Sequence, residues 1–147
     1  MSRRHTERIL SGGFNNSPPR SRRRVVAKTA NYICVDKDSG TVFTTEGAGG
    51  SITFTLPAVT LTGWWATFVN LAAQNMTISS AEGGNIVGRD SVGAAEDLTL
   101  NTITFGTSPH RTGNGLTLVS TGTRWVVLMS LFAREATITT QVPATTT

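Results

Sequence analysis

The residues that could do chemistry in this chain are scattered, and no pair of them has a spacing typical of a catalytic site. Hydrolysis by paired carboxylates needs two acids that converge in a cleft, whereas seven of the nine acids of this chain fall almost wholly in predicted turns or at strand ends. They are Asp36, Asp38, Glu46, Glu82, Asp90, Glu96 and Asp97. Turn formation and solubility account for these side chains, so the sequence predicts no carboxylate chemistry.

The candidate nucleophiles and metal ligands lead to the same conclusion. Cys34 has no identifiable base, which favours a small buried apolar residue over a nucleophile. His5 and His110 have no partner His or Cys at a zinc-site spacing. The segment 36–40 begins like a calcium loop but lacks the third oxygen ligand and the distal glutamate. We therefore expect no catalytic residue, no metal site and no cofactor.

Two adjacent tryptophans are the most suggestive remaining feature, because exposed indole rings can stack on sugar rings. Successive strand residues face opposite ways, so one ring of Trp64 and Trp65 should point inward. The run 125–129 is apolar on both faces and is expected to be the most buried strand or part of a subunit interface. We predict an oligomer interface that contains Trp64, Trp65 and Trp125. Glycan contact by the adjacent pair or by the 106–115 loop is the alternative.

The composition of the 147-residue chain favours one all-β domain. Thr supplies 25 residues and Gly 15, whereas Lys, Glu, Gln and Met are scarce, and this balance disfavours helices. Cys34 is the single cysteine, so no internal disulfide stabilises the fold. No apolar run approaches the ~20 residues of a membrane-spanning helix, and we expect no membrane partner.

Ten strands are predicted from Thr-, Val- and Ile-rich runs that alternate with turn signals. Their expected ranges are 32–36, 41–45, 51–56, 66–71, 76–79, 85–87, 97–105, 115–120, 124–132 and 136–142. In 51–56 the period of two places Ile52, Phe54 and Leu56 on the core face. The spacing is typical of a mostly antiparallel β-sandwich or a barrel-like, jelly-roll-like domain. No exact internal repeat is visible, so we expect no solenoid.

Charge divides the chain into a basic N-terminal part and an acidic body. Residues 1–28 hold eight Arg or Lys against Glu7, a net charge of +7, and residues 29–147 hold five basic and eight acidic residues, a net charge of −3. Turn-forming residues dominate the basic part, which indicates disorder when it is alone. We predict a flexible basic arm (1–30), a β domain (31–142) and a polar C-terminal tail (143–147).

The arm needs a partner that neutralises its charge, either nucleic acid or an acidic protein surface, unless it is merely a solubilising tail. Ile9, Leu10 and Phe14 favour a protein, because a segment that binds only phosphate needs no apolar anchors. Nucleic-acid binding also requires aromatic and basic residues interleaved on the β surface, and the Arg residues beyond position 28 are few and scattered. We therefore expect docking to protein and no nucleic-acid partner.

A set of short motifs resembles tailed-bacteriophage structural proteins, namely capsid decoration (cement) proteins and head-fibre modules. The central element is a glycine-rich turn, a Thr-alternating strand and the triplet Leu56, Pro57 and Ala58. The segments that carry the resemblance are 38–45, 47–50, 52–58, 68–70, 75–78 and 123–127, within about residues 32 to 130. The resemblance implies a β-sandwich or barrel-like domain that is commonly trimeric, lies where capsid subunits meet and has no active site.

The expected function is therefore that of a virion structural protein, made in the host cytoplasm and located on the capsid surface. A homotrimer would bridge subunits of the major capsid protein and stabilise the shell. In this hypothesis the arm residues bind the capsid: Arg3, Arg4, Arg8, Ile9, Leu10, Phe14, Arg20, Arg22, Arg23 and Arg24. The alternative is a head fibre, spike or tail module that contacts host surface glycan, but one compact domain behind one arm favours decoration.

Overall fold

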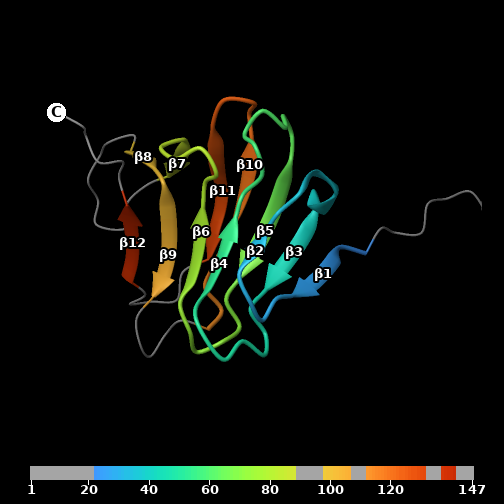
Figure 1. Cartoon of the computed structure of the whole chain (residues 1–147), viewed down its shortest axis with the longest axis vertical. Helices are drawn as coiled ribbons and strands as arrows, with labels where there is room; N and C mark the ends of the chain where they lie inside the picture. Colours follow the sequence, from blue (N-terminus) through green and yellow to red (C-terminus); the bar gives the residue numbers. More distant parts are fainter. Residues whose placement is uncertain (1–21, 89–97, 107–111, 132–136, 142–147) are drawn as a thin grey trace, which may run out of the picture.

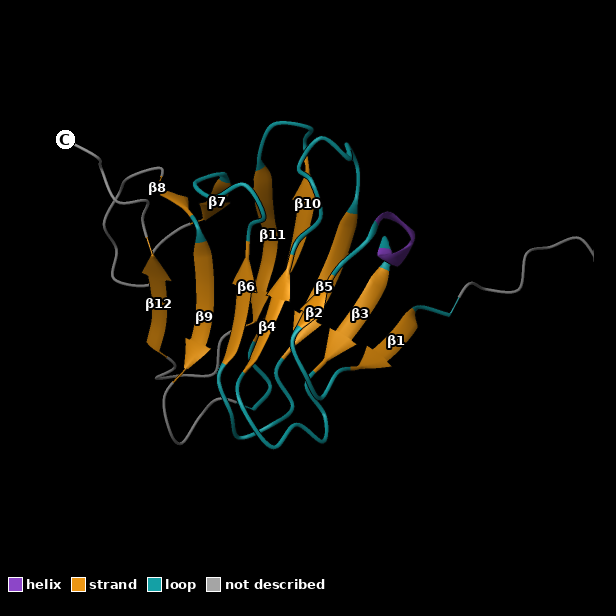
Figure 2. Cartoon of the chain, viewed as in Figure 1, coloured by secondary structure: helices purple, strands orange, loops and turns teal. Residues whose placement is uncertain are grey.

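The computed structural model describes residues 22–88, 98–106, 112–131 and 137–141. Within these ranges the chain forms twelve strands and one 3₁₀ turn, which confirms the all-β prediction (Figure 2). The elements are β1 (Arg24–Ala27), β2 (Tyr32–Ile33), η1 (Asp36–Asp38), β3 (Thr41–Thr44), β4 (Ile52–Thr55), β5 (Trp65–Val69), β6 (Met76–Ser79), β7 (Ile86–Gly88), β8 (Leu98–Leu100), β9 (Thr102–Gly106), β10 (Gly115–Ser120), β11 (Trp125–Leu131) and β12 (Thr137–Gln141). The tail 143–147 lies outside the described residues.

The strands make two sheets that share one core (Figure 1). The seven-stranded sheet has the order β1-β3-β5-β10-β11-β7-β8, and the five-stranded sheet has the order β12-β9-β6-β4-β2. Phe54 of β4 contacts Phe43 of β3 and Phe68 of β5 across the space between the sheets, with ring centroids 5.5 and 5.1 Å apart. Phe43 and Phe68 also stack on each other at 5.5 Å. An aromatic cluster therefore joins the two sheets.

Side-chain alternation places these residues, as the period of two predicts. Ile52 and Phe54 are buried, while Thr53 and Thr55 between and beside them are partly exposed. β6 and β9 repeat the pattern in register with β4, so that Phe54, Ile78 and Ile103 form one inward row across three strands. Burial of such a row stabilises both sheets at once.

The prediction of mostly antiparallel strands is wrong, since five of the ten pairings in the described residues are parallel. β1, β3 and β5 run parallel in one sheet, and β2, β4 and β6 run parallel in the other. Because successive strands alternate between the sheets, the chain from β1 to β6 winds as a coil.

This coil is solenoid-like, contrary to the expectation drawn from the missing repeat. Paired residues lie 17 positions apart between β1 and β3, as in Arg24 and Thr41, but 25 apart between β3 and β5, as in Val42 and Thr67. Connections of unequal length leave no repeat in the sequence, although the backbone pairing repeats. Strand pairing, not sequence periodicity, therefore defines the coil.

Two strand predictions needed correction. The expected strand 97–105 is two strands, β8 and β9, which belong to different sheets and are separated by Asn101. β11 is not the most buried strand: Trp125 is fully buried, but Leu128 is 64% exposed. The register between β10 and β11 shifts at this point, because Thr117 pairs with Met129 and Leu118 with Val127. Leu128 is the extra residue of this β-bulge and lies outside the ladder.

One glycine permits the closest strand approach. A Cβ atom at Gly115 would overlap the carbonyl oxygen of Phe68 and lie 3.1 Å from Cα of Val69. Gly115 pairs directly with Val69 at the start of β10. Glycine at this position therefore lets β10 pair with β5 at the centre of the seven-stranded sheet.

Candidate attachment surface

The edge strand β1 is formed by residues that the sequence assigned to the arm. Arg24, Val25, Val26 and Ala27 pair in parallel with Thr41–Thr44 of β3, and the backbone N–H of Lys28 donates to the carbonyl of Thr44 at 2.8 Å. Val26 packs against the core. Residues 24–28 are therefore part of the described β-structure, although the sequence analysis assigned them to the arm (1–30).

Three cations near β1 contact the body of the same chain. The guanidinium of Arg23 lies over the ring of Trp65, 5.7 Å from its centroid. Arg24 Nη1 lies 3.7 Å from Asp38 Oδ1, and the ammonium of Lys28 lies 3.4 Å from the ring centroid of Tyr32. Arg23 and Arg24, which the sequence analysis predicted to bind the capsid, thus contact the body of their own chain.

The other predicted capsid-binding residues are not brought together by the described structure. Arg22 is exposed and lies two residues before the start of β1. The remaining members of the set lie outside the described residues: Arg3, Arg4, Arg8, Ile9, Leu10, Phe14 and Arg20. β1 is therefore the point at which the arm joins the folded domain.

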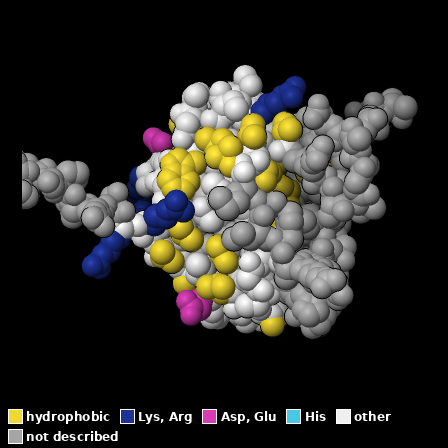
Figure 3. Space-filling model, turned by 180° about the vertical axis from the view of Figure 1, so that it is seen from behind, with side chains coloured by type: hydrophobic (Ala, Val, Ile, Leu, Met, Phe, Trp, Pro, Cys, Tyr) yellow, Lys and Arg dark blue, Asp and Glu magenta, His cyan; other side chains and the backbone are white. Residues whose placement is uncertain are grey.

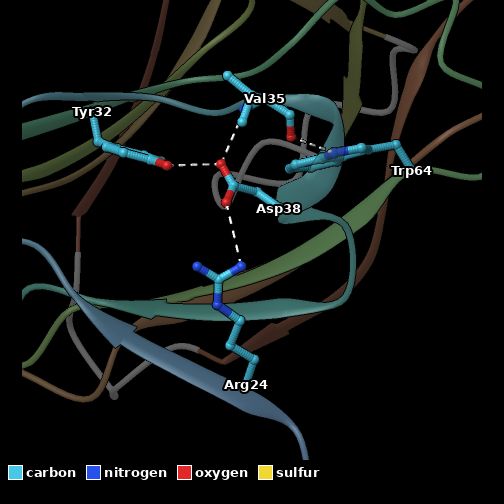
Figure 4. A network of polar contacts seen from close by, with 5 residues as sticks. All are labelled: Arg24, Tyr32, Val35, Asp38 and Trp64. Carbon is cyan, nitrogen blue, oxygen red and sulfur yellow. Dashed lines mark hydrogen bonds and ion pairs between the residues drawn. The ribbon is translucent and has the colours of Figure 1, made fainter.

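Asp38 is the centre of the polar network beside β1 (Figure 4). Its carboxylate is 1% exposed and accepts hydrogen bonds from the Tyr32 hydroxyl at 2.8 Å and from the Val35 backbone N–H at 3.0 Å. The Trp64 indole N–H donates to the carbonyl of Val35 at 3.1 Å. With Arg24 on its second oxygen, Asp38 joins β1, β2 and η1. The sequence suggested only a turn residue here.

Two groups near this network have raised pKa values. The hydrogen bond from Tyr32 to Asp38 raises the pKa of the tyrosine hydroxyl, because ionisation would remove the donated proton, and burial adds to this effect. Burial also raises the pKa of the Cys34 thiol to about 12, with the nearby Asp38 carboxylate as a second cause. Cys34 is 2% exposed. It is a core residue with a protonated thiol, as the sequence indicated.

Cys34 is expected to resist alkylation by iodoacetamide at pH 8 in the folded protein and to react fully in denaturant. Since folding raises the thiol pKa from 9.0 to about 12, the unfolded chain loses the proton first. The contribution of the protonated Cys34 thiol to the stability of the fold is therefore fully present below pH 9 and is lost as the pH rises towards 12. Denaturant midpoints at pH 8 and pH 11 should therefore differ more for the wild type than for Cys34→Ala. Rapid alkylation of the folded protein would contradict this prediction.

The three tryptophans do not form the predicted oligomer interface together. Trp64 and Trp125 are 3% and 0% exposed in a single chain and pack edge to face, with ring centroids 5.4 Å apart. The structure places both in the core instead of at a subunit interface. Trp65 points the opposite way and is partly exposed beneath Arg23. The opposite orientation of the adjacent pair follows from strand geometry.

An open cleft of about 420 Å³ lies next to η1. It is lined by Asp36, Ser39, Thr60, Leu61, Thr62, Gly63 and Trp64. Its hydroxyls and the exposed Asp36 carboxylate can hydrogen-bond to a polar ligand. Because Trp64 is buried, little of its ring is available to stack on a sugar, and this weakens the hypothesis that Trp64 contacts glycan. Residues 107–111 of the 106–115 loop lie outside the described residues.

Two common kinds of functional feature do not occur in the described ranges. They contain no group of three His, Cys, Asp or Glu side chains that could hold a metal ion. No helix in them has the length and apolar character required to cross a membrane. Comparison with protein-family models finds no match, and comparison with curated proteins finds no similar sequence either.

The outward faces of the two sheets differ in a way that the sequence analysis missed. The outward positions of β4, β6 and β9 carry hydroxyl side chains: Thr53, Thr55, Thr77, Ser79, Thr102 and Thr104. The outward positions of the seven-stranded sheet include the hydrogen-bonded pair Thr67 and Thr117, with Oγ1 atoms 2.8 Å apart, but are otherwise largely apolar: Val42, Trp65, Val69, Val87, Val119 and Val126. The sequence contained a signal for this difference, because the segments 41–45, 66–71 and 115–120 have apolar residues on both faces.

Proposed function

We propose that this chain is a virion structural protein without enzymatic activity, which binds as a homotrimer to the outside of a tailed-phage capsid. Its body is proposed to be a β-sandwich of the jelly-roll-like class, and its arm to bind the major capsid protein and bridge neighbouring subunits. The observation that carries the proposal is the separation of charge between residues 1–28, at +7, and residues 29–147, at −3. A cationic segment on an acidic body can bind an external partner of opposite charge.

The construction of β1 supports this role. The four pairs between β1 and β3, together with the Arg24–Asp38 contact, attach the arm to the edge of the larger sheet. Any force along the arm is therefore distributed over several backbone hydrogen bonds and one buried carboxylate. This is the arrangement required of a tether that holds a folded domain on a larger particle.

Multiple arms make modest contacts sufficient. A capsid presents many identical sites, and a trimer carries three copies of the arm, so each attachment raises the effective concentration of the next. Arg3, Arg4 and Arg8 would pair with capsid carboxylates, as would Arg20 and Arg22. Ile9, Leu10 and Phe14 would occupy apolar grooves, which gives the contact a specificity that charge alone lacks.

Deleting residues 1–21 is expected to abolish co-sedimentation with phage capsids that lack this protein, while β1 and its contacts remain intact. The circular dichroism spectrum and the oligomer mass should not change. A matched control is deletion of residues 142–147, which should leave binding unchanged. In the full chain, replacing Ile9, Leu10 and Phe14 by serine should weaken binding at least about tenfold. Undiminished capsid binding by the variant without residues 1–21 would reject the proposal.

A further inference from the structure

The outer edge of β1 is open in the described part of the chain. β1 is the end strand of the seven-stranded sheet, and Figure 1 shows no described strand beyond it. In a parallel ladder the N–H and C=O groups of one residue face the same side, and those of the next residue face the other side. Because the backbone N–H of Lys28 donates to the Thr44 carbonyl, the peptide groups of Val25 and Ala27 face away from β3. Such an edge can pair with a further strand.

The side chains of β1 alternate between two kinds of surface. Arg24 and Lys28 lie on the same face as Val26, which packs against the core. Val25 and Ala27 lie on the other face. Val25 is 63% exposed, and the side chain of Arg24 is 58% exposed although it contacts a carboxylate. A strand added at this edge would therefore meet positive charge along one face and apolar side chains along the other.

Positive charge is concentrated at this end of the molecule. Residues 22–38 hold five basic and two acidic residues, a net charge of +3, and one of these acids, Asp38, is buried. The other described residues hold only Arg124 against Glu46 and Glu82, a net charge of −1. Figure 3 shows Lys and Arg side chains gathered on the left, where β1 lies, with hydrophobic side chains beside them. The edge of β1 therefore combines cations with exposed apolar groups.

Charge disfavours the two occupants that this chain could supply. Residues 1–21 hold four basic residues and one acidic residue, a net charge of +3, so this segment would bring like charge to the edge. A second copy of β1 carries the same cations and is repelled for the same reason. Nucleic acid would satisfy the cations but would leave the outward peptide groups of Val25 and Ala27 without a ladder. An acidic polypeptide in extended conformation matches both the charge and the open edge.

We propose that the outer edge of β1 binds an acidic, extended segment of a partner protein, which adds to the seven-stranded sheet as a further strand. Carboxylates of the segment would pair with Arg24 and Lys28, and apolar residues between them would pack against Val25. Main-chain hydrogen bonds give strand addition its affinity, and the alternating side chains give its specificity. The site lies in the folded body and differs from the proposed capsid-binding arm, so it does not require a capsid as the partner.

A fluorescent synthetic peptide of roughly eight residues, alternating aspartate and valine, tests this proposal by anisotropy with the full chain. It should bind, whereas the same peptide with methylated backbone nitrogens, or with lysine in place of aspartate, should bind at least about tenfold more weakly. Val25→Pro should weaken binding by a similar factor, because it removes an outward N–H but no bond to β3. Val25→Thr is the matched control, since it keeps the N–H and should bind like the wild type.

Arg22→Ser should weaken binding of the aspartate peptide about threefold, because it removes an exposed cation beside β1. Arg124→Ser removes an exposed cation elsewhere and should have no effect. No binding by the wild type, or equal binding of the methylated peptide, would overturn the proposal. Tighter binding after deletion of residues 1–21 would overturn it too and assign the edge to the arm, and preference for single-stranded DNA would assign it to nucleic acid. Peptide binding by a protein that does not bind capsids would reject only the proposed function.

Discussion

Replacing Phe54 by alanine is expected to lower the free energy of unfolding by about 3–5 kcal/mol, the largest effect that we predict for a single side chain. Phe54 is fully buried and touches Phe43 and Phe68 of the opposite sheet, while Ile78 lies beside it in the adjacent strand. The substitution removes the aromatic contact between the sheets and leaves a cavity that neighbouring strands cannot close. Urea denaturation followed by tryptophan fluorescence measures the change.

The matched control for this prediction is Thr53→Ala in the same strand. Thr53 faces outward and is partly exposed. Its backbone N–H donates to Asn31 Oδ1 at 2.8 Å, and the substitution leaves this backbone donor in place. Its replacement should alter the free energy of unfolding by less than about 1 kcal/mol. Equal effects at positions 53 and 54 would contradict the assignment of the two faces of β4.

Replacing Asp38 by alanine is expected to cost about 2–4 kcal/mol of stability, because one buried carboxylate accepts two hydrogen bonds and faces Arg24. The Tyr32 hydroxyl and the Val35 N–H would then lose their acceptor. Arg24 contributes less, since its side chain is 58% exposed and its distance to Asp38 is 3.7 Å. Hydrogen exchange should reveal faster opening of β1 and β2 than of β4.

Asp36→Ala is the control for this prediction. Asp36 lies in the same 3₁₀ turn but is exposed, so its loss removes a surface carboxylate without breaking the network around Asp38. The expected change is below about 0.5 kcal/mol. If both substitutions had the same small effect, Asp38 would be a turn residue of the kind that the sequence suggested, and β1 would be held by its backbone pairing alone.

The faces of the strands could be predicted from the sequence, but the partners of the strands could not. Alternation in 51–56 identifies Ile52 and Phe54 as core residues because side chains alternate in every strand, whatever lies beside it. Whether β4 pairs in parallel with β2 and β6 depends on the path of the connections, which alternation does not encode. The antiparallel expectation was wrong for this reason.

The candidate site was harder to predict than the core. β1 contains two valines between cations, a segment too short to distinguish from an arm by composition, and its ladder with β3 becomes visible only in the fold. Trp64 and Trp65 were recognised as oppositely directed, but the edge-to-face partner Trp125 is remote in sequence. Asp38 resembles any turn acid until Tyr32 and Arg24 are placed beside it.

The position of β10 between β5 and β11 has a consequence for biosynthesis. During translation, the coil from β1 to β6 leaves the ribosome first, yet β5 pairs on one side with residues 115–120, about fifty positions later. Until that segment emerges, β5 can pair with β3 on one side but has an unpaired edge on the other, with Phe68 within the strand. Such an edge is a site for aggregation, so completion of the larger sheet is a late event that protects the newly made chain.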